Sequence, residues 1–329
     1  MKFIKKNWKK ITVCISIILL ILFVYFFENI SEFLFADTNK YRGELIKAVS
    51  PIIMAIVAIL TWLNNSKNNL KTKEKQIVEQ TSFNSAVKHL GNENQSVVLG
   101  GIHALHQIAV DNKNYTQVVH NLFCSYLREN SAKLYENIDF EKTPDKCSVI
   151  IQTLIDYLFR PYNNKDSVYK EYKSDLSFST FKNCDFNSID VKNVIFDYCL
   201  LETCNFNNSC LTSCNFLKGT LTDCKFIDGS LTVCDFNSGK LTDCIFNSGT
   251  LTECSFYVCT LTKCIFNSTT LTNCNFILGI LTDCKFIDGS LTVCNFSSGI
   301  LTKCNFEKGT LNDCNFKNTK LINTELPPN

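Results

Sequence analysis

The cysteines are the residues of this sequence with the most obvious capacity for chemistry, because regularly spaced thiols can form disulfides or bind soft metals. The 329 residues contain 19 of them. Fifteen share one position of a five-residue pattern: Cys184, Cys199, Cys259 and every tenth residue from Cys204 to Cys314. Cys210 falls at a different position, and the sequence contains no C-x-x-C pair of the kind found in zinc knuckles. A buried thiol packs as a small apolar group, so we predict a structural role, with a disulfide ladder or a string of metal sites as alternatives.

Four histidines form a second group with potential chemistry. His103 and His106 are three residues apart and would share a helix face, where they could bind a metal together with His89 or His120. Cys124 follows His120 by four residues and could add a ligand. The alternative is a set of surface or partly buried helical histidines. The sequence has no phosphate-binding loop, nucleophile elbow, HExxH motif or paired catalytic carboxylate, so we predict neither an enzyme nor a cofactor.

The charge balance argues against two classes of protein. There are 33 Lys and Arg against 31 Asp and Glu, and this net charge of +2 disfavours a globally basic nucleic-acid binder and an acidic tail protein. Residues 174–329 contain 15 acidic residues, 11 lysines and no arginine. That region is weakly negative and has no basic stripe, so nucleic acid is not a predicted partner.

The cysteines are positioned by an internal repeat that fills residues 174–328. Leu and Phe each recur every ten residues, five residues out of phase, and a small residue lies two positions before each of them. A period of five fits neither an α-helix nor a long strand. It fits a chain that turns a corner every five residues and closes a square coil after 20, and the segment 221–234 indeed recurs identically at 281–294.

This geometry predicts a core of stacked inward side chains. Phe206, Phe226 and Phe246 would form one stack, with Phe216 and Phe236 on the opposite face. Leucines would occupy the other two faces, and cysteines would fill the small inward positions. The remaining predicted core residues are Leu211, Leu221, Leu231, Cys204, Cys214, Cys224 and Cys234.

The N-terminal 63 residues have the pattern of a transmembrane hairpin anchor. Residues 11–27 carry no charge, and residues 45–63 carry only Lys47, near one end. Each run is about long enough to span a bilayer as a helix. Lysines flank both runs while acidic residues fill the loop between them, so the positive-inside rule predicts that both termini lie in the cytoplasm.

Residues 64–173 are predicted to form a linker and a small α-helical domain. Val98, Ile102, Leu105 and Ala109 recur at the spacing of one helix face. Gly100 and Gly101 lie inside this pattern, where we expect close helix packing.

Two segments resemble known proteins. Units such as CNFNS (204–208), CDFNS (234–238) and CNFEK (304–308) resemble the pentapeptide-repeat family. Residues 83–111 resemble the helical segment that precedes the repeats in bacterial membrane-anchored members, although His103 and His106 stand where Tyr and Glu are usual. The resemblance implies a right-handed quadrilateral β-helix over residues 174–328, a solenoid that serves protein–protein interaction.

We therefore predict a non-enzymatic scaffold in the bacterial inner (cell) membrane, a multi-pass protein that contacts lipids through its hairpin and an unknown cytosolic protein through its rod. A homo-oligomer is left open. The alternative function is a two-helix membrane effector that oligomerises and perturbs the membrane on sensing a signal, with Lys47 as the residue to test. A weaker alternative is a DNA-mimic topoisomerase inhibitor, which would need a more acidic surface.

Overall fold

A computed structural model describes residues 38–136, 147–161 and 166–327, with side chains from residue 50 onward except that of residue 52. The chain divides into two compact units, residues 1–78 and 79–329. The first predicted membrane span, residues 11–27, lies outside the described residues, as does the side chain of Lys47.

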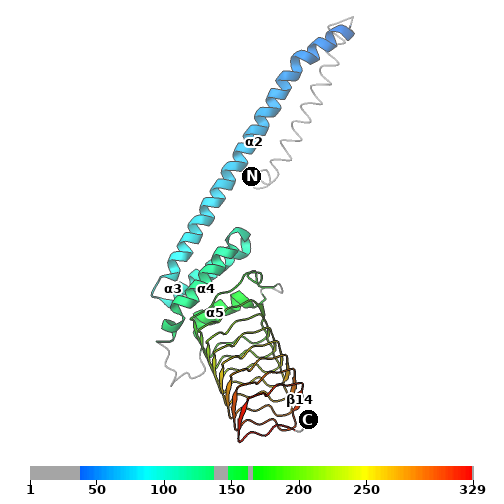
Figure 1. The fold of residues 1–329 in the computed structure, drawn as a ribbon. Helices are drawn as coiled ribbons and strands as arrows, with labels where there is room; N and C mark the ends of the chain where they lie inside the picture. Colours follow the sequence, from blue (N-terminus) through cyan, green and yellow to red (C-terminus); the bar gives the residue numbers. More distant parts are fainter. Residues whose placement is uncertain (1–37, 137–146, 162–165, 328–329) are drawn as a thin grey trace. The chain divides into compact units, whose positions relative to one another are not determined.

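Helix α2 (Thr38–Leu90) is 53 residues long and contains the second predicted span, with Pro51 inside it (Figure 1). Residues 45–63 are therefore helical, as predicted. Within the part of the chain that the structure describes, however, no helix has both the length and the apolarity that crossing a membrane requires. The prediction of two transmembrane helices thus has no support from the described residues.

Three shorter helices form the small domain predicted in the middle of the chain. They are α3 (Gln95–Asp111), α4 (Lys113–Glu136) and α5 (Val149–Phe159). Helix α3 begins where the Asn94 side chain accepts a hydrogen bond from the Ser96 amide at 2.9 Å, a standard N-cap. Gly101 permits close packing, because a Cβ there would lie 2.8 Å from the Cβ of His89, whereas Gly100 faces open space. The expectation of close packing is confirmed for Gly101 alone.

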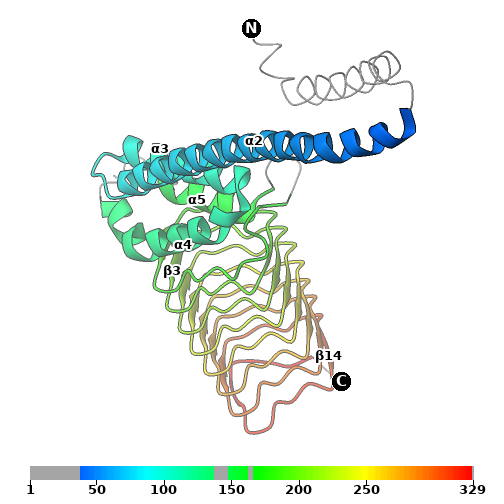
Figure 2. The same ribbon diagram turned by 90° about the horizontal axis from the view of Figure 1, so that it is seen from above.

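The repeat region is a solenoid of parallel strands, as predicted (Figures 1 and 2). Odd-numbered strands form an eight-stranded sheet and even-numbered strands a seven-stranded one. In strands β1 to β13 the central residue of the three is buried and the two beside it are not, whereas in β14 and β15, at the last coils, the central leucine is half-buried or exposed. The strands are β1 (Thr180–Lys182), β2 (Asp190–Lys192), β3 (Leu200–Glu202), β4 (Cys210–Thr212), β5 (Thr220–Thr222), β6 (Ser230–Thr232), β7 (Lys240–Thr242), β8 (Thr250–Thr252), β9 (Thr260–Thr262), β10 (Thr270–Thr272), β11 (Ile280–Thr282), β12 (Ser290–Thr292), β13 (Ile300–Thr302), β14 (Thr310–Asn312) and β15 (Lys320–Ile322).

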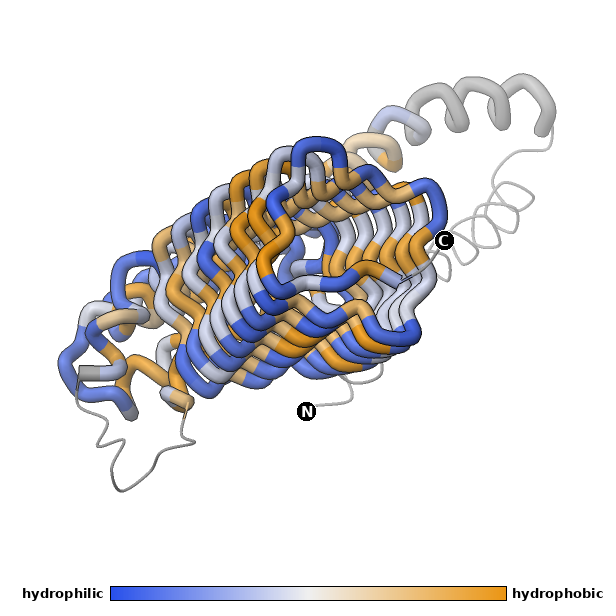
Figure 3. The backbone as a smooth tube through the Cα atoms, turned by 60° about the horizontal axis from the view of Figure 1, so that its bottom comes forward, coloured by the Kyte–Doolittle hydropathy of each residue, from blue (hydrophilic) through white to orange (hydrophobic). Residues whose placement is uncertain are grey.

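Two stacks of phenylalanine rings fill the centre of the solenoid. Phe206 and Phe226 lie parallel with ring centroids 4.8 Å apart, and Phe216 and Phe236 do so at 4.7 Å. The two stacks meet edge to face, as Phe206 and Phe216 show with centroids 6.3 Å apart at 82°. Both geometries are favourable for aromatic pairs. Figure 3 shows how residues of like hydropathy align from coil to coil.

The corners are made by residues in the left-handed backbone region rather than by glycine. Thirty non-glycine residues, one in every five from Phe178 to Asn323, have positive φ near 55°. The glycines lie inward instead, where space is short: a Cβ on Gly249 would be 2.9 Å from the carbonyl oxygen of Gly229. Their conformation is ordinary, so the small inward residue is required by packing.

Candidate functional site

The core residues predicted from the repeat lie where they were expected. Phe206, Phe216, Phe226, Phe236, Phe246, Leu211, Leu221, Leu231, Cys204, Cys214, Cys224 and Cys234 are all buried. They form the interior of the solenoid and present no side chain to a ligand. The functional surface must therefore be sought on the outward positions and at the ends.

The repeat cysteines are hydrogen-bonded thiols of this core. The Sγ of Cys224 lies 3.5 Å from the carbonyl oxygen of Leu201, and the Sγ of Cys304 lies 3.5 Å from that of Leu281. All described cysteines are free thiols, and Cys210 is exposed, in keeping with its different phase. Burial raises the pKa of Cys199 and of Cys259 to about 12, so these groups stay protonated and weakly nucleophilic.

The histidines pair with tyrosines of the helical domain. The ring of His106 stacks on Tyr157 at a centroid distance of 3.7 Å, and its Nδ1 lies 3.2 Å from the Tyr169 hydroxyl. His103 bonds to the Tyr157 hydroxyl, and His120 Nε2 lies 2.9 Å from Ser174 Oγ. Desolvation, and secondly the charge of His103, lower the pKa of His106 to about 4. Among the described residues no three His, Cys, Asp or Glu side chains converge on a metal position.

Helices α3, α4 and α5, here called the helical cap, cover the end of the solenoid at which β1 lies (Figure 2). Three side-chain oxygens of the cap accept hydrogen bonds from first-coil amides: Ser131 Oγ from Thr180 at 2.9 Å, Tyr135 Oη from Lys182 at 2.8 Å and Gln152 Oε1 from Asp185 at 2.9 Å. In the next coil, the amides of Leu200 and Asn205 donate to the carbonyls of Ser179 and Cys184, at 3.1 and 2.9 Å. The cap therefore takes the place of a preceding coil and satisfies an otherwise open strand edge.

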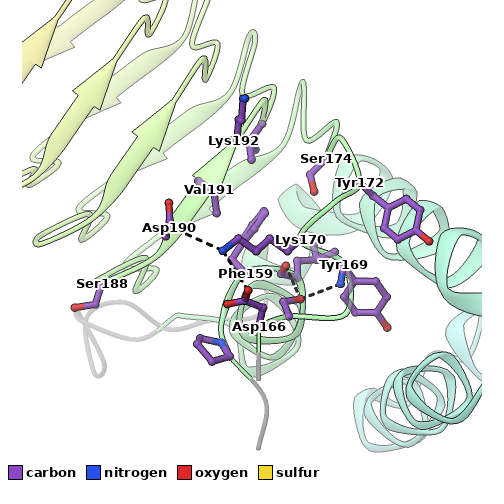
Figure 4. Close-up of a pocket in the computed structure, with 14 residues that line it drawn as sticks. Phe159, Asp166, Tyr169, Lys170, Tyr172, Ser174, Ser188, Asp190, Val191 and Lys192 are labelled. Atoms are coloured by element: carbon purple, nitrogen blue, oxygen red, sulfur yellow. Dashed lines mark hydrogen bonds and ion pairs between the residues drawn. The ribbon is translucent and has the colours of Figure 1, made fainter. Parts of the chain in front are cut away.

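A small hollow lies where the segment after α5 passes β2 (Figure 4). Its volume is about 100 Å³, and Lys170 lies in it with its Nζ 3.3 Å from Asp166 Oδ2 and 3.6 Å from Asp190 Oδ2. Pockets for small-molecule ligands usually have volumes of roughly 300–1,000 Å³. This hollow has room for a few water molecules, and its lysine is paired with carboxylates.

The four corners of the solenoid share one backbone conformation but differ in their side chains. One corner, at residues 178, 198, 258 and 278, exposes Phe178, Tyr198, Val258 and Leu278. Next to it, at the start of the outward strand surface, Leu200, Ile280 and Ile300 are exposed. We call these seven residues the apolar ridge. Another corner is polar in every coil: Ser188, Asn208, Asp228, Ser248, Ser268, Asp288 and Lys308.

Two aromatic side chains of the apolar ridge contact each other directly. The rings of Phe178 and Tyr198 stack at 4.8 Å and 8°. The Lys218 ammonium lies 5.4 Å from the centroid of the Tyr198 ring, a cation–π contact. Ile280 on β11 and Ile300 on β13 are register partners. The ridge therefore has two apolar parts, and Lys218 and Ser238 occupy the same corner between Tyr198 and Val258.

Neither the apolar ridge nor the contacts between the helical cap and the first coil were predicted from the sequence. The ridge could have been found by examining the outward position two residues after each Phe and after Leu176, where most residues are polar and Phe178, Tyr198, Val258 and Leu278 are not. The cap contacts had no such signal, because Tyr135 and Lys182 are 47 residues apart and belong to no repeat.

Comparisons with known proteins bear on the repeat region. A family model described as pentapeptide repeats matches residues 280–318. HetL, a pentapeptide repeat protein involved in heterocyst differentiation regulation from the cyanobacterium Nostoc, is 15% identical over 45% of this chain and 81% of HetL, with a TM-score of 0.22. A trypsin-treated form of QnrB1, a plasmid-mediated fluoroquinolone resistance protein, is 19% identical over 44% of this chain and 81% of QnrB1, with a TM-score of 0.27. A search of curated proteins found no match. The matched residues have the same backbone and side-chain pattern as the other coils, so the similarity to pentapeptide repeats that the family model finds at residues 280–318 describes the repeat unit of the solenoid.

Proposed function

We propose that this protein is a non-enzymatic scaffold whose solenoid binds a protein partner through the apolar ridge. One observation carries the proposal: one corner exposes four bulky apolar residues where the backbone disfavours them, whereas the corner that contains Val233 and Val293 exposes two. Val258 has φ of 58°, a left-handed conformation that costs an L-residue about 1–2 kcal/mol and suits Asn far better than a β-branched residue. Its side chain is 42% exposed, so burial in the fold does not offset that cost.

The dimensions of the ridge suit a protein interface. Its corner runs from Phe178 to Leu278, five coils apart, which is about 24 Å at roughly 4.8 Å per coil. Exposed aromatic and aliphatic residues rimmed by polar ones are typical of interaction sites. Lys218 and Lys240 lie between the two apolar ends of the ridge, so the partner we expect is an apolar strip with acidic residues near its middle.

We propose in addition that the N-terminal unit associates with the cytoplasmic membrane of a bacterium, with both termini in the cytoplasm. The support is the segment from Met54 to Leu63, in which every side chain is exposed and nine of ten are apolar. Met54 and Trp62 are 70% and 67% exposed. A helix that is apolar on all sides needs an apolar environment. Carbonate extraction of membranes tests this: the full chain should stay in the pellet and the Ile56→Lys, Ile59→Lys variant should not, with Asn64→Lys as the control. Extraction of the unchanged chain would refute membrane association.

The two alternative functions have less support. For the membrane effector, no described residue distinguishes an active hairpin from an anchor. For DNA mimicry, a continuous acidic face would be expected, but a third corner mixes signs: Asp223, Asp243, Lys263, Asp283 and Lys303. The mixed charges favour a protein partner over mimicry of a polyanion.

Site-specific photo-cross-linking in living cells tests the scaffold proposal. A photoreactive amino acid is placed at Tyr198, Val258 or Leu278 on the apolar ridge, or at the matched polar-corner positions Asn208, Ser248 or Ser268. We expect one protein species to be cross-linked from the ridge and not from the polar corner. Equal cross-linking from both corners, or none from either, would contradict the proposal.

A further inference from the structure

Two cysteines from distant parts of the sequence meet at the junction of the helical cap and the solenoid. Cys147 precedes α5, and Cys184 follows β1 in the first coil. Their Sγ atoms are 2.9 Å apart although the residues are 37 positions apart. A disulfide bond is about 2.05 Å long, so the two sulfurs need to approach by only about 0.9 Å to be joined.

This contact replaces one that later coils make. In the second coil, the Sγ of Cys204 lies 3.3 Å from the carbonyl oxygen of Phe181 in the coil before it. The first coil has no coil before it, and the Cys184 thiol instead faces the thiol of Cys147. The stack of inward thiols at Cys184, Cys204 and every twentieth residue after them thus ends at Cys147, which lies two residues before helix α5 of the cap.

Tyr135 holds the two sulfurs in place. Its hydroxyl lies 3.2 Å from Cys184 Sγ and 3.8 Å from Cys147 Sγ. The same hydroxyl accepts a hydrogen bond from the Lys182 amide at 2.8 Å and donates to the Lys182 carbonyl at 3.1 Å. Because both backbone groups of one strand residue fix this hydroxyl, the sulfur pair is positioned by the α4–β1 contact as well as by its own loop.

The two thiols differ in access. Cys184 is buried, and its pKa is raised well above the ordinary value, chiefly by desolvation. Cys147 is partly exposed. A soluble oxidant can therefore reach Cys147 first, while Cys184 is placed to resolve the product.

We infer that Cys147 and Cys184 are a covalent modification site, at which hydrogen peroxide converts the two thiols to a reversible disulfide that joins the segment leading into helix α5 of the cap to the first coil. The Cys147 thiolate attacks one oxygen of the peroxide, the O–O bond breaks, and the sulfenic acid forms as hydroxide leaves. The Cys184 sulfur then attacks the Cys147 sulfur; the S–S bond forms, the S–O bond breaks, and the hydroxyl leaves with the Cys184 proton as water. Two thiols lose two electrons, and the O–O bond of the peroxide takes them up. A dithiol reduces this disulfide to the two thiols again and is itself oxidised to a disulfide.

The test uses the full chain in detergent with hydrogen peroxide as the oxidant. After oxidation, free thiols are blocked with N-ethylmaleimide, and the non-reduced digest is read by mass spectrometry. We expect a Cys147–Cys184 cross-linked peptide, lost on addition of dithiothreitol, while exposed Cys210 is found alkylated or oxidised without a partner. In the Cys147→Ser variant Cys184 should remain a thiol, whereas Cys210→Ser should leave the cross-link unchanged. Recovery of Cys147 as a sulfinic acid, as an alkylated thiol or joined to another cysteine would overturn the inference, and so would an unlinked Cys184.

Discussion

The interior positions of the solenoid are nearly uniform in residue type, whereas its corner positions vary widely. Inside, each position is occupied by nearly one residue type from coil to coil, and Phe246 contacts four other phenylalanines at centroid distances of 4.7 to 6.3 Å. At the corners the backbone is equally regular, yet residues as different as Lys218, Ser238 and Leu278 take the same φ. The interior therefore specifies the fold, whereas differences among corners are free to specify what the fold binds.

The same contrast explains why the most conspicuous residues of the sequence do not single out one position of the solenoid. The repeat cysteines are numerous because each coil needs small inward residues. Repetition makes them prominent but makes them equivalent, so none of them marks a site. Cys184 is the exception, because its column ends there and the next thiol belongs to the helical cap.

The largest effect expected is the loss of a central ring. Phe246→Ala removes a fully buried side chain stacked between Phe226 and Phe266, each 4.7 Å away, and should lower the free energy of unfolding by about 3–5 kcal/mol. Phe316→Ala, in the last coil, removes a ring that is only partly buried and stacks on Phe296 alone. It should cost roughly half as much.

Urea unfolding of the two variants, followed by hydrogen exchange of the strand amides, measures this difference. Equal losses at both positions would show that the stability of the interior does not depend on having a coil on each side.

A smaller effect is expected where the helical cap replaces a coil. Tyr135→Phe removes the hydroxyl that bonds to both the amide and the carbonyl of Lys182 and should cost about 1–3 kcal/mol, because two backbone groups lose this hydrogen bond in a partly buried place. Hydrogen exchange in β1 should accelerate while strands β7 to β9 stay protected. The control is Tyr126→Phe, on the same helix, with little expected change. Unaltered exchange in β1 would contradict the role given to the cap.

Acid should loosen the cap before the solenoid. The pKa of His106 is lowered from 6.5 to about 4, so the folded state binds fewer protons than the unfolded chain in this interval. Stability is therefore lost as the pH falls below 6.5 and levels off below about 4, by about 1–3 kcal/mol in all.

Hydrogen exchange in α3 and α5 at pH 7 and pH 4.5 measures this loss. The His106→Asn variant should show a flatter pH dependence than the unchanged chain. A cap that is equally protected at both pH values would contradict the prediction.

The buried residues of the interior could be predicted from the sequence, whereas the features that occur only once could not. The phase of Phe206 and Leu211 predicted their stacks because one contact, repeated every 20 residues, leaves a periodic record. A corner was predicted every five residues. The left-handed backbone conformation of the corner residues was not predicted, because glycine, the usual marker of that conformation, does not occupy these positions. The bonds from Tyr135 to Lys182 and from Cys147 to Cys184 could not be predicted, since each is made once, between segments related only through the fold.

The smallest effect on stability is expected at the corner where the largest effect on binding is expected. Val258→Asn and Leu278→Asn place a residue that tolerates positive φ at two corners of the apolar ridge. Because neither side chain is buried and Asn tolerates the left-handed backbone, the free energy of unfolding should not fall, and it should rise by up to about 1 kcal/mol as the backbone cost at Val258 is relieved. The matched control is Ser248→Asn with Ser268→Asn on the polar corner.

The most direct test of the account is the dissociation constant of the cross-linked partner for the full chain and for these two double variants. We expect Val258→Asn with Leu278→Asn to weaken binding at least about tenfold, equivalent to about 1.4 kcal/mol, with no loss of stability, and the polar-corner variant to bind normally. Normal binding by the ridge variant, or an equal loss in both variants, would contradict the claim that the apolar ridge is the contact surface.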